Sequence, residues 1–73
     1  MVNTERNRII VEGKVLCEHK GDIYEIELGN NIKVRAKRAG RMARNKIKVL
    51  ADDRVLVELS EYDLTRGRIV RRL

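Results

Sequence analysis

The most distinctive chemistry in this 73-residue sequence is positive charge concentrated in one short segment. From Lys33 to Lys48 the chain carries eight lysine or arginine side chains in sixteen positions and no acidic one. These charges repel one another, which costs stability, and a bound polyanion would relieve that cost. A charged face that only keeps the protein soluble is the simpler alternative, but the mixed charges of residues 1–36 would serve that purpose equally well. The segment therefore favours nucleic-acid binding.

Two other groups of residues could do chemistry, and for both we favour the simpler interpretation. Cys17 and His19 are two positions apart, so in a strand both would point to one face, as a catalytic dyad requires. A small apolar cysteine inside the fold and a histidine at a loop edge is the more ordinary arrangement. One cysteine and one histidine also cannot complete a zinc site, which usually has four ligands. Asp52 and Asp53 lie in a turn, where adjacent acids usually bond to the backbone.

Size and composition exclude several other classes of protein. The single cysteine rules out an internal disulfide, and no apolar run approaches the roughly 18 residues of a membrane span. The N-terminus has no apolar stretch typical of a signal peptide, so we expect a cytoplasmic protein without membrane contact. The net charge is +6, and no glycine loop, histidine spacing or nucleophile–base pair indicates an enzyme. We expect a non-catalytic monomer without metal or cofactor, with a flexible arm over residues 1–7 and one domain over residues 8–73.

The strands that position the charges are predicted by alternating apolar and polar residues. This pattern covers residues 9–17, 24–28, 32–37, 55–59 and 67–71. In the first strand Cys17 shares the inner face, and in the second Tyr24 does. In the third strand Ile32, Val34 and Ala36 are expected to fill the core, which leaves the lysine and arginine residues between them outside.

The breaks between strands indicate the fold. Ala39, Met42 and Ala43 are spaced as on one face of a helix, which predicts a short helix after Gly40. Ser60 and Asp63 have a spacing like that of a capping box, which predicts a helical turn over residues 61–65. Five short strands with a helical insertion after the third are typical of an all-β, five-stranded Greek-key OB barrel. An SH3-like barrel, with its short helical turn before the last strand, is the alternative.

In OB folds the outer face of strands two and three commonly holds oligonucleotides. The basic side chains of residues 33–37 would lie on this face, and a second cluster closes the chain at Arg66, Arg68, Arg71 and Arg72. Tyr24 and Tyr62 are the only aromatic residues, whereas general single-strand binders stack bases on several rings. A surface rich in cations but poor in rings is suited to backbone and shape, which favours folded RNA.

Two segments resemble a known family. Residues 39–50, AGRMARNKIKVL, look like the SGKMRKNYIRIL segment of bacterial translation initiation factor one. Residues 53–70, DRVLVELSEYDLTRGRIV, resemble GDRVTVELSPYDLTRGRIV of the same family. The similarity covers residues 9–71 without an insertion. Departures are Ala43 in place of a basic residue, Lys46 in place of an aromatic residue, and a different loop over residues 18–22.

The resemblance implies an S1-like OB fold and a role in translation initiation. Members of this family bind 16S ribosomal RNA at the decoding A site of the small (30S) ribosomal subunit, beside a ribosomal protein. There they block premature tRNA entry and assist initiation factors two and three, without catalysis or a cofactor. The setting would be the bacterial cytoplasm or an organelle with bacterial-type ribosomes.

The basic segment and the resemblance together give the candidate site. The residues predicted to contact ribosomal RNA are Arg35, Lys37, Arg38, Gly40, Arg41, Arg44, Lys46, Lys48, Arg66 and Arg68, with Tyr62 as a possible stacking ring. Met42 is expected to pack rather than bind. A general RNA chaperone of cold-shock type is the alternative function, although this chain lacks the aromatic strings of such proteins. An accessory structural protein of the ribosome is a further alternative.

Overall fold

The computed structural model describes residues 2–5 and 8–73, with side chains from residue 8 onward except at residue 30. Within these residues the elements are β1 (Val2–Glu5), β2 (Arg8–His19), β3 (Ile23–Glu27), a 3-10 turn η1 (Gly29–Asn31), β4 (Lys33–Arg38), α1 (Gly40–Arg44), β5 (Arg54–Leu59) and β6 (Arg66–Arg72). No helix among them is long and apolar enough to cross a membrane. The short strands follow from the alternation of apolar and polar residues, which is broken at each turn.

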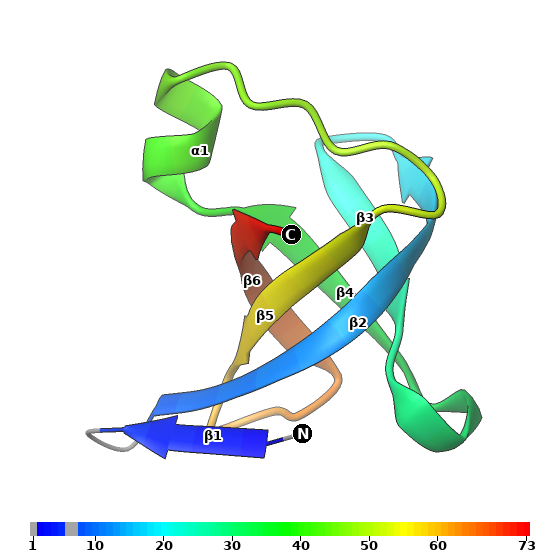
Figure 1. Cartoon of the computed structure of the whole chain (residues 1–73), viewed down its shortest axis with the longest axis vertical. Helices are drawn as coiled ribbons and strands as arrows, with labels where there is room; N and C mark the ends of the chain where they lie inside the picture. The colour runs from blue at the N-terminus through cyan, green and yellow to red at the C-terminus, as the bar shows by residue number, and fades with distance from the viewer. Residues whose placement is uncertain (1, 6–7) are drawn as a thin grey trace.

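Five of the strands close into a barrel. The sheet has the order β1-β2-β3-β4-β6-β5, and β2 also pairs with β5, which closes the ring. All pairings are antiparallel except that of β4 with β6, which is parallel. In Figure 1, α1 lies at one end of the barrel, near the end of β4, and β1 lies at the other. This is the predicted Greek-key OB barrel with its helix after the third barrel strand, so the OB interpretation is confirmed over the SH3-like alternative.

Part of the predicted N-terminal arm pairs with the barrel. Val2–Glu5 form β1, which lies antiparallel to β2 with Val2 opposite Val11 and Glu5 opposite Arg8. The sequence pattern did not indicate this strand. Residues 1, 6 and 7 lie outside the described residues, and the flexibility of the arm stays a prediction.

The core consists of the inward residues of the barrel strands. Ile26, Val55, Val57 and Ile69 have no exposed surface. Burying each such side chain contributes roughly 1.5–3 kcal/mol to stability. Tyr24 is 4% exposed, which confirms its predicted core position, and burial raises the pKa of its hydroxyl.

Two residues predicted inside the barrel are outside it. Cys17 is exposed, because a register shift between Val15 and Cys17 interrupts the alternation of β2 and turns Cys17 outward. A β-bulge of this kind inserts one extra residue and so changes the face on which every following side chain lies. Ile32 is 54% exposed, because β4 begins one residue later, at Lys33.

The two predicted helical turns have different outcomes. The turn after Ala39 is confirmed as α1, and its Met42 is 3% exposed and packs in the core as expected. Residues 61–65 are not helical. Instead, the Ser60 hydroxyl oxygen accepts hydrogen bonds from the backbone N–H groups of Tyr62 and Asp63, which holds a non-helical turn before β6.

Candidate nucleic-acid interface

The outer face of β4 carries the first part of the predicted site. Val34 and Ala36 are buried, so Arg35 and Lys37 between them point to solvent, and both are exposed. This is the alternation that a strand with one buried face requires. The prediction that these two cations lie outside is therefore confirmed.

Strand β6 adds two more cations directly beside them. In the parallel β4–β6 pair, Arg35 lies opposite Arg66, and Lys37 lies opposite Arg68. All four residues are exposed, and we refer to Arg35, Lys37, Arg66 and Arg68 as the strand patch. Like charges placed opposite each other across two strands destabilise a sheet. The fold thus accepts an electrostatic cost at this surface.

Acidic side chains relieve only half of the strand patch. The Arg66 Nε lies 3.6 Å from a carboxylate oxygen of Asp63, and an Arg68 guanidinium nitrogen lies 3.2 Å from Glu58. Glu58 also accepts a hydrogen bond from Arg8 at 2.9 Å, and the bonds from Arg8 and Arg68 lower the pKa of its carboxyl. Among the described residues, no acidic group forms an ion pair with Arg35 or Lys37.

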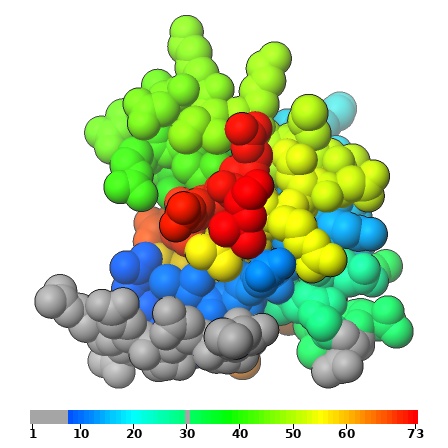
Figure 2. Space-filling view, viewed as in Figure 1, coloured from blue at the N-terminus to red at the C-terminus, as the bar shows by residue number. Residues whose placement is uncertain are grey.

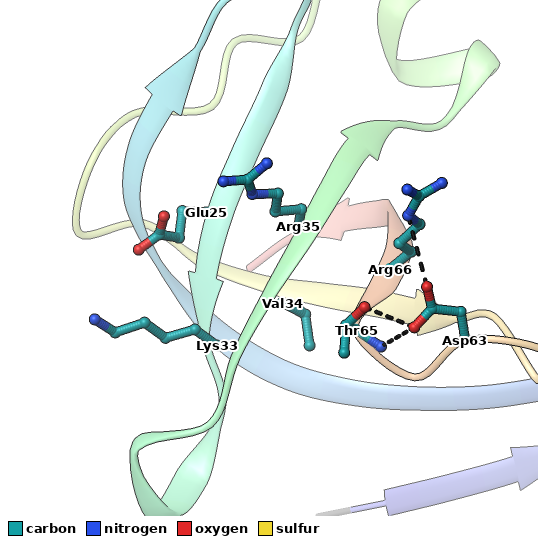
Figure 3. Close-up of a pocket in the computed structure, with 7 residues that line it drawn as sticks. All are labelled: Glu25, Lys33, Val34, Arg35, Asp63, Thr65 and Arg66. Atoms are coloured by element: carbon teal, nitrogen blue, oxygen red, sulfur yellow. Dashed lines mark hydrogen bonds and ion pairs between the residues drawn. The ribbon is translucent and has the colours of Figure 1, made fainter.

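A hollow of about 380 Å³ lies next to the strand patch. It is lined by Glu25, Lys33, Val34, Arg35, Asp63, Thr65 and Arg66 (Figure 3). In this view Glu25 extends from β3 between Lys33 and Arg35, and Arg66 reaches from the start of β6. Its lining combines three cations, Lys33, Arg35 and Arg66, with the carboxylates of Glu25 and Asp63, so positive side chains outnumber negative ones.

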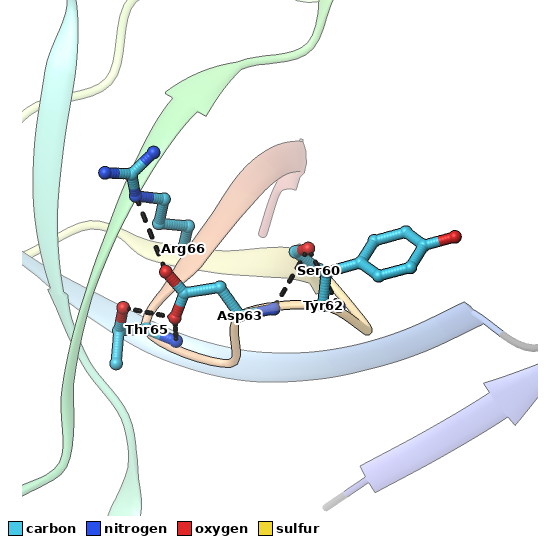
Figure 4. A network of polar contacts seen from close by, with 5 residues as sticks. All are labelled: Ser60, Tyr62, Asp63, Thr65 and Arg66. Carbon is cyan, nitrogen blue, oxygen red and sulfur yellow. Dashed lines mark hydrogen bonds and ion pairs between the residues drawn. The ribbon is translucent and has the colours of Figure 1, made fainter.

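The turn that precedes β6 presents Tyr62 to solvent (Figure 4). The tyrosine is 92% exposed, and Figure 4 shows its ring pointing away from the barrel. Tyr62, named from the sequence as a possible stacking ring, therefore lies on the surface. A ring exposed in this way can stack on a base.

Hydrogen bonds fix the shape of this turn. The Thr65 hydroxyl and the Thr65 backbone N–H donate to one carboxylate oxygen of Asp63, at 2.6 and 3.0 Å. These bonds, the hydroxyl first, hold the pKa of the Asp63 carboxyl below its usual range. The Arg35 N–H in turn donates to the Thr65 carbonyl at 2.9 Å, so the turn is tied to β4. The turn that carries Tyr62 is therefore held in a fixed position beside the start of β6.

The segment around α1 holds most of the remaining predicted residues. Gly40, Arg41, Arg44, Lys46 and Lys48 are all exposed. Met42, on the inner side of α1, anchors the helix on the barrel, which leaves the two arginines of the helix facing outward.

Arg38 differs from the other predicted contacts. Its side chain is 17% exposed, and its guanidinium donates a hydrogen bond to the Ile47 carbonyl at 3.0 Å. A second guanidinium nitrogen lies 3.5 Å from an Asp22 carboxylate oxygen. These contacts tie the end of β4 to the loop before β3 and to the segment after α1. These contacts hold the Arg38 side chain within the protein, and its contact with ribosomal RNA stays a prediction.

Two arginines outside the predicted site lie beside α1. Arg71 and Arg72 line a hollow together with Arg41, Met42, Ile47 and Val70. Figure 2 shows the C-terminal residues, in red, beside the green segment that contains α1. Arg72 also donates a hydrogen bond to the Lys48 carbonyl at 3.0 Å. The C-terminal charge cluster signals these residues in the sequence, but only the fold brings them next to Arg41.

Comparisons with known proteins agree on one family. The model of the family described as translation initiation factor 1A / IF-1 matches residues 3–73. A solved structure is similar with a TM-score of 0.78: the solution structure of translation initiation factor IF-1 from the Wolbachia endosymbiont strain TRS of Brugia malayi. It is 36% identical in sequence, and the match covers 93% of this chain and 80% of that chain.

Proposed function

The chain belongs to the translation initiation factor 1A / IF-1 family, and from this premise we propose that it binds 16S ribosomal RNA at the decoding A site of the small ribosomal subunit. Bound there, it would block premature entry of tRNA and assist initiation factors two and three. It would act as a monomer in the bacterial cytoplasm or in an organelle with bacterial-type ribosomes. Its proposed role is to bind the small subunit and to exclude tRNA from the A site, without catalysis.

The observation that carries this proposal is the strand patch. Two pairs of cations face each other across β4 and β6, and Arg35 and Lys37 have no acidic partner among the described residues. A bound polyanion would relieve the repulsion among these cations. Arg41, Arg44 and Lys48 extend the positive charge to the α1 end. A surface that spans a strand face and a barrel end fits folded RNA.

The scarcity of exposed rings argues against the cold-shock alternative. Single-strand binders of that type stack successive bases on aromatic side chains. Here Tyr24 is buried, which leaves Tyr62 as the only aromatic side chain on the surface, since the chain has two tyrosines and neither phenylalanine nor tryptophan. One exposed ring cannot form the row of stacked bases on which such binders depend.

Co-sedimentation with isolated small ribosomal subunits tests the proposal. The titration is repeated at several salt concentrations, with and without a competitor that binds the decoding A site. A structured RNA similar in length to the RNA of the small subunit serves as the control. We expect one protein per subunit, loss of binding with the competitor, and a log–log salt slope of about −4 to −5 for roughly six phosphate contacts.

Two results would contradict the proposal. Equal binding to the control RNA, unaffected by the competitor, would indicate a general RNA chaperone. Binding that persists after the large subunit has joined would indicate a structural ribosomal protein, because an initiation factor must leave the subunit.

A further inference from the structure

A thiol, an imidazole and a carboxylate meet on the outer surface where β2 ends. Cys17 and His19 are two residues apart on β2, and Glu25 lies directly opposite Cys17 on β3. The Cys17 Sγ is 3.6 Å from the His19 Nε2, which is 3.2 Å from a carboxylate oxygen of Glu25. The three ligand atoms all lie within 4.8 Å of one another. The bulge after Val15 creates this cluster, because it turns Cys17 out of the core.

The sulfur–nitrogen and nitrogen–oxygen distances are close to those of ligands around one tetrahedral ion. Zinc binds sulfur at about 2.3 Å, histidine nitrogen at about 2.0–2.1 Å and carboxylate oxygen at about 2.0–2.2 Å. With tetrahedral angles, these bond lengths place sulfur and nitrogen about 3.6 Å apart, and nitrogen and oxygen about 3.4 Å apart. The observed distances are 3.6 and 3.2 Å.

The donor set selects the metal. A thiolate and an imidazole together suit Zn²⁺, whereas Mg²⁺ and Ca²⁺ prefer oxygen ligands alone. From this geometry we propose that Cys17, His19 and Glu25 form a Zn²⁺ site with three protein ligands and a fourth position open to water. Sites of this open kind differ from closed structural sites, in which the protein supplies all four ligands.

The register explains why the sequence alone indicates no such site. Cys17 and His19 are visible as neighbours, but Glu25 is six residues from His19 and joins them only through the β2–β3 pairing. The cross-strand neighbour of Glu25 on β4 is Arg35, whose charge opposes that of a bound cation. Glu25 forms no ion pair with Arg35 in the described structure, so its carboxylate is available to the cluster.

Cobalt titration of the free protein tests the proposal. The protein must carry no histidine tag, because His19 is the only histidine of the chain and tag histidines would also bind the metal. The protein is reduced and stripped of metal before Co²⁺ is added. We expect one Co²⁺ per chain, a thiolate-to-cobalt charge-transfer band, intense visible bands of a four-coordinate ion, and displacement by Zn²⁺. Since Cys17 is the only cysteine, a thiolate band can come from no other residue.

Single substitutions assign the ligands. Cys17→Ser should abolish the charge-transfer band, and His19→Gln and Glu25→Gln should each weaken Zn²⁺ binding by more than the roughly 10- to 100-fold typical of residues behind the ligands. Glu18→Gln is the matched control, because it removes the same charge from an exposed residue of β2 outside the cluster, and it should bind Zn²⁺ like the parent. Circular dichroism of each variant establishes that the barrel is intact.

Several outcomes would overturn the site. The first is a cobalt spectrum without a thiolate band. The second is an equal loss of Zn²⁺ affinity in Glu18→Gln and Glu25→Gln, and the third is one ion shared by two chains. A hydrogen-bonded cluster that takes no metal would give the first of them. Because the measurement needs no ribosome, its failure would leave the proposed RNA binding untouched.

Discussion

Arg35 shows most clearly how a single residue links stability to function. It is exposed on β4, lies opposite Arg66 in the sheet and has no ion pair among the described residues. In the free protein its repulsion from Arg66 is therefore a cost, whereas beside a phosphate the same charge becomes a favourable contact. The two effects can be separated by neutralising the side chain.

We expect Arg35→Gln to stabilise the free protein and to weaken its binding to the small subunit. Relief of the repulsion from Arg66 should raise the free energy of unfolding by about 0.2–1 kcal/mol. Loss of one phosphate contact should lower the steepness of the log–log salt dependence by about one. Urea unfolding and co-sedimentation at several salt concentrations measure the two quantities.

Arg54→Gln is the matched control for this variant. Arg54 is also an exposed arginine of a barrel strand, but it pairs with Glu12 at 3.4 Å and lies outside the strand patch. Its substitution should leave subunit binding nearly unchanged and should not stabilise the protein. Equal losses of binding for Arg35→Gln and Arg54→Gln would show that net charge alone, rather than the patch, drives binding.

Tyr62 is the second residue whose role can be isolated. It is 92% exposed, so its ring buries little surface in the fold. Tyr62→Ala should leave the free energy of unfolding within about 0.5 kcal/mol of the parent. If the ring stacks on a base, binding to the subunit weakens by about 1–3 kcal/mol, and Tyr62→Phe restores it. An unchanged affinity for Tyr62→Ala would remove this residue from the site.

At the scale of elements, β6 depends on a glycine. A Cβ atom at Gly67 would lie 2.7 Å from the Glu58 carbonyl oxygen and 2.8 Å from a Val57 methyl carbon. Because one of these atoms belongs to the backbone of β5, the two strands would have to separate. Arg66 and Arg68, on either side of this glycine, would shift with the strand.

Gly67→Ala should therefore destabilise the protein by about 1–3 kcal/mol, as overpacking does elsewhere. Gly40→Ala is the control, because a Cβ there meets nothing within 4 Å. Its free energy of unfolding should be unchanged or raised by less than about 1 kcal/mol. Chemical unfolding of both variants measures the difference, and equal stabilities would contradict the close β5–β6 contact.

The turn before β6 predicts a pH dependence. The Thr65 hydroxyl and backbone N–H lower the pKa of Asp63 in the folded protein below its ordinary value of 3.8. The carboxylate therefore contributes stability above this value, and the contribution is lost as the pH falls through the lower pKa of the folded state.

Asp63→Asn removes this titration, so its free energy of unfolding should fall less steeply than that of the parent below about pH 4. Thr65→Val removes the hydroxyl donor but keeps the carboxylate. Its free energy of unfolding should therefore depend on pH below about pH 4 less than that of the parent but more than that of Asp63→Asn. Urea unfolding at a series of acidic pH values gives the curves. Parallel curves for all three proteins would contradict the role of this turn.

At the scale of the whole molecule, the net charge of +6 predicts opposite salt effects on folding and on binding. Salt screens the repulsion among the cations of the strand patch and the α1 segment, so moderate salt should raise the melting temperature of the free protein. The same salt weakens binding to RNA through counterion release. Thermal unfolding and co-sedimentation in the same buffers test both signs, and a melting temperature that falls with salt would contradict the repulsion.

The sequence by itself predicted the barrel, its strands and the outward direction of Arg35 and Lys37. These features follow from local patterns, since a strand with one buried face must alternate and a break in alternation marks a turn. The same patterns predicted Tyr24 in the core, and the resemblance implied that Met42 packs. The resemblance over residues 39–50 and 53–70 pointed to the family that the comparisons then showed.

What depends on strand pairing was decided only by the tertiary structure. The bulge after Val15 moves Cys17 from core to surface, and the β2–β3 register brings Glu25 beside it. The parallel β4–β6 pairing, between segments about thirty residues apart, sets Arg35 against Arg66. No local sequence pattern predicts these cross-strand contacts, because closure of the barrel fixes the register of each strand pair. A shift of the register by one residue would change the face of every side chain.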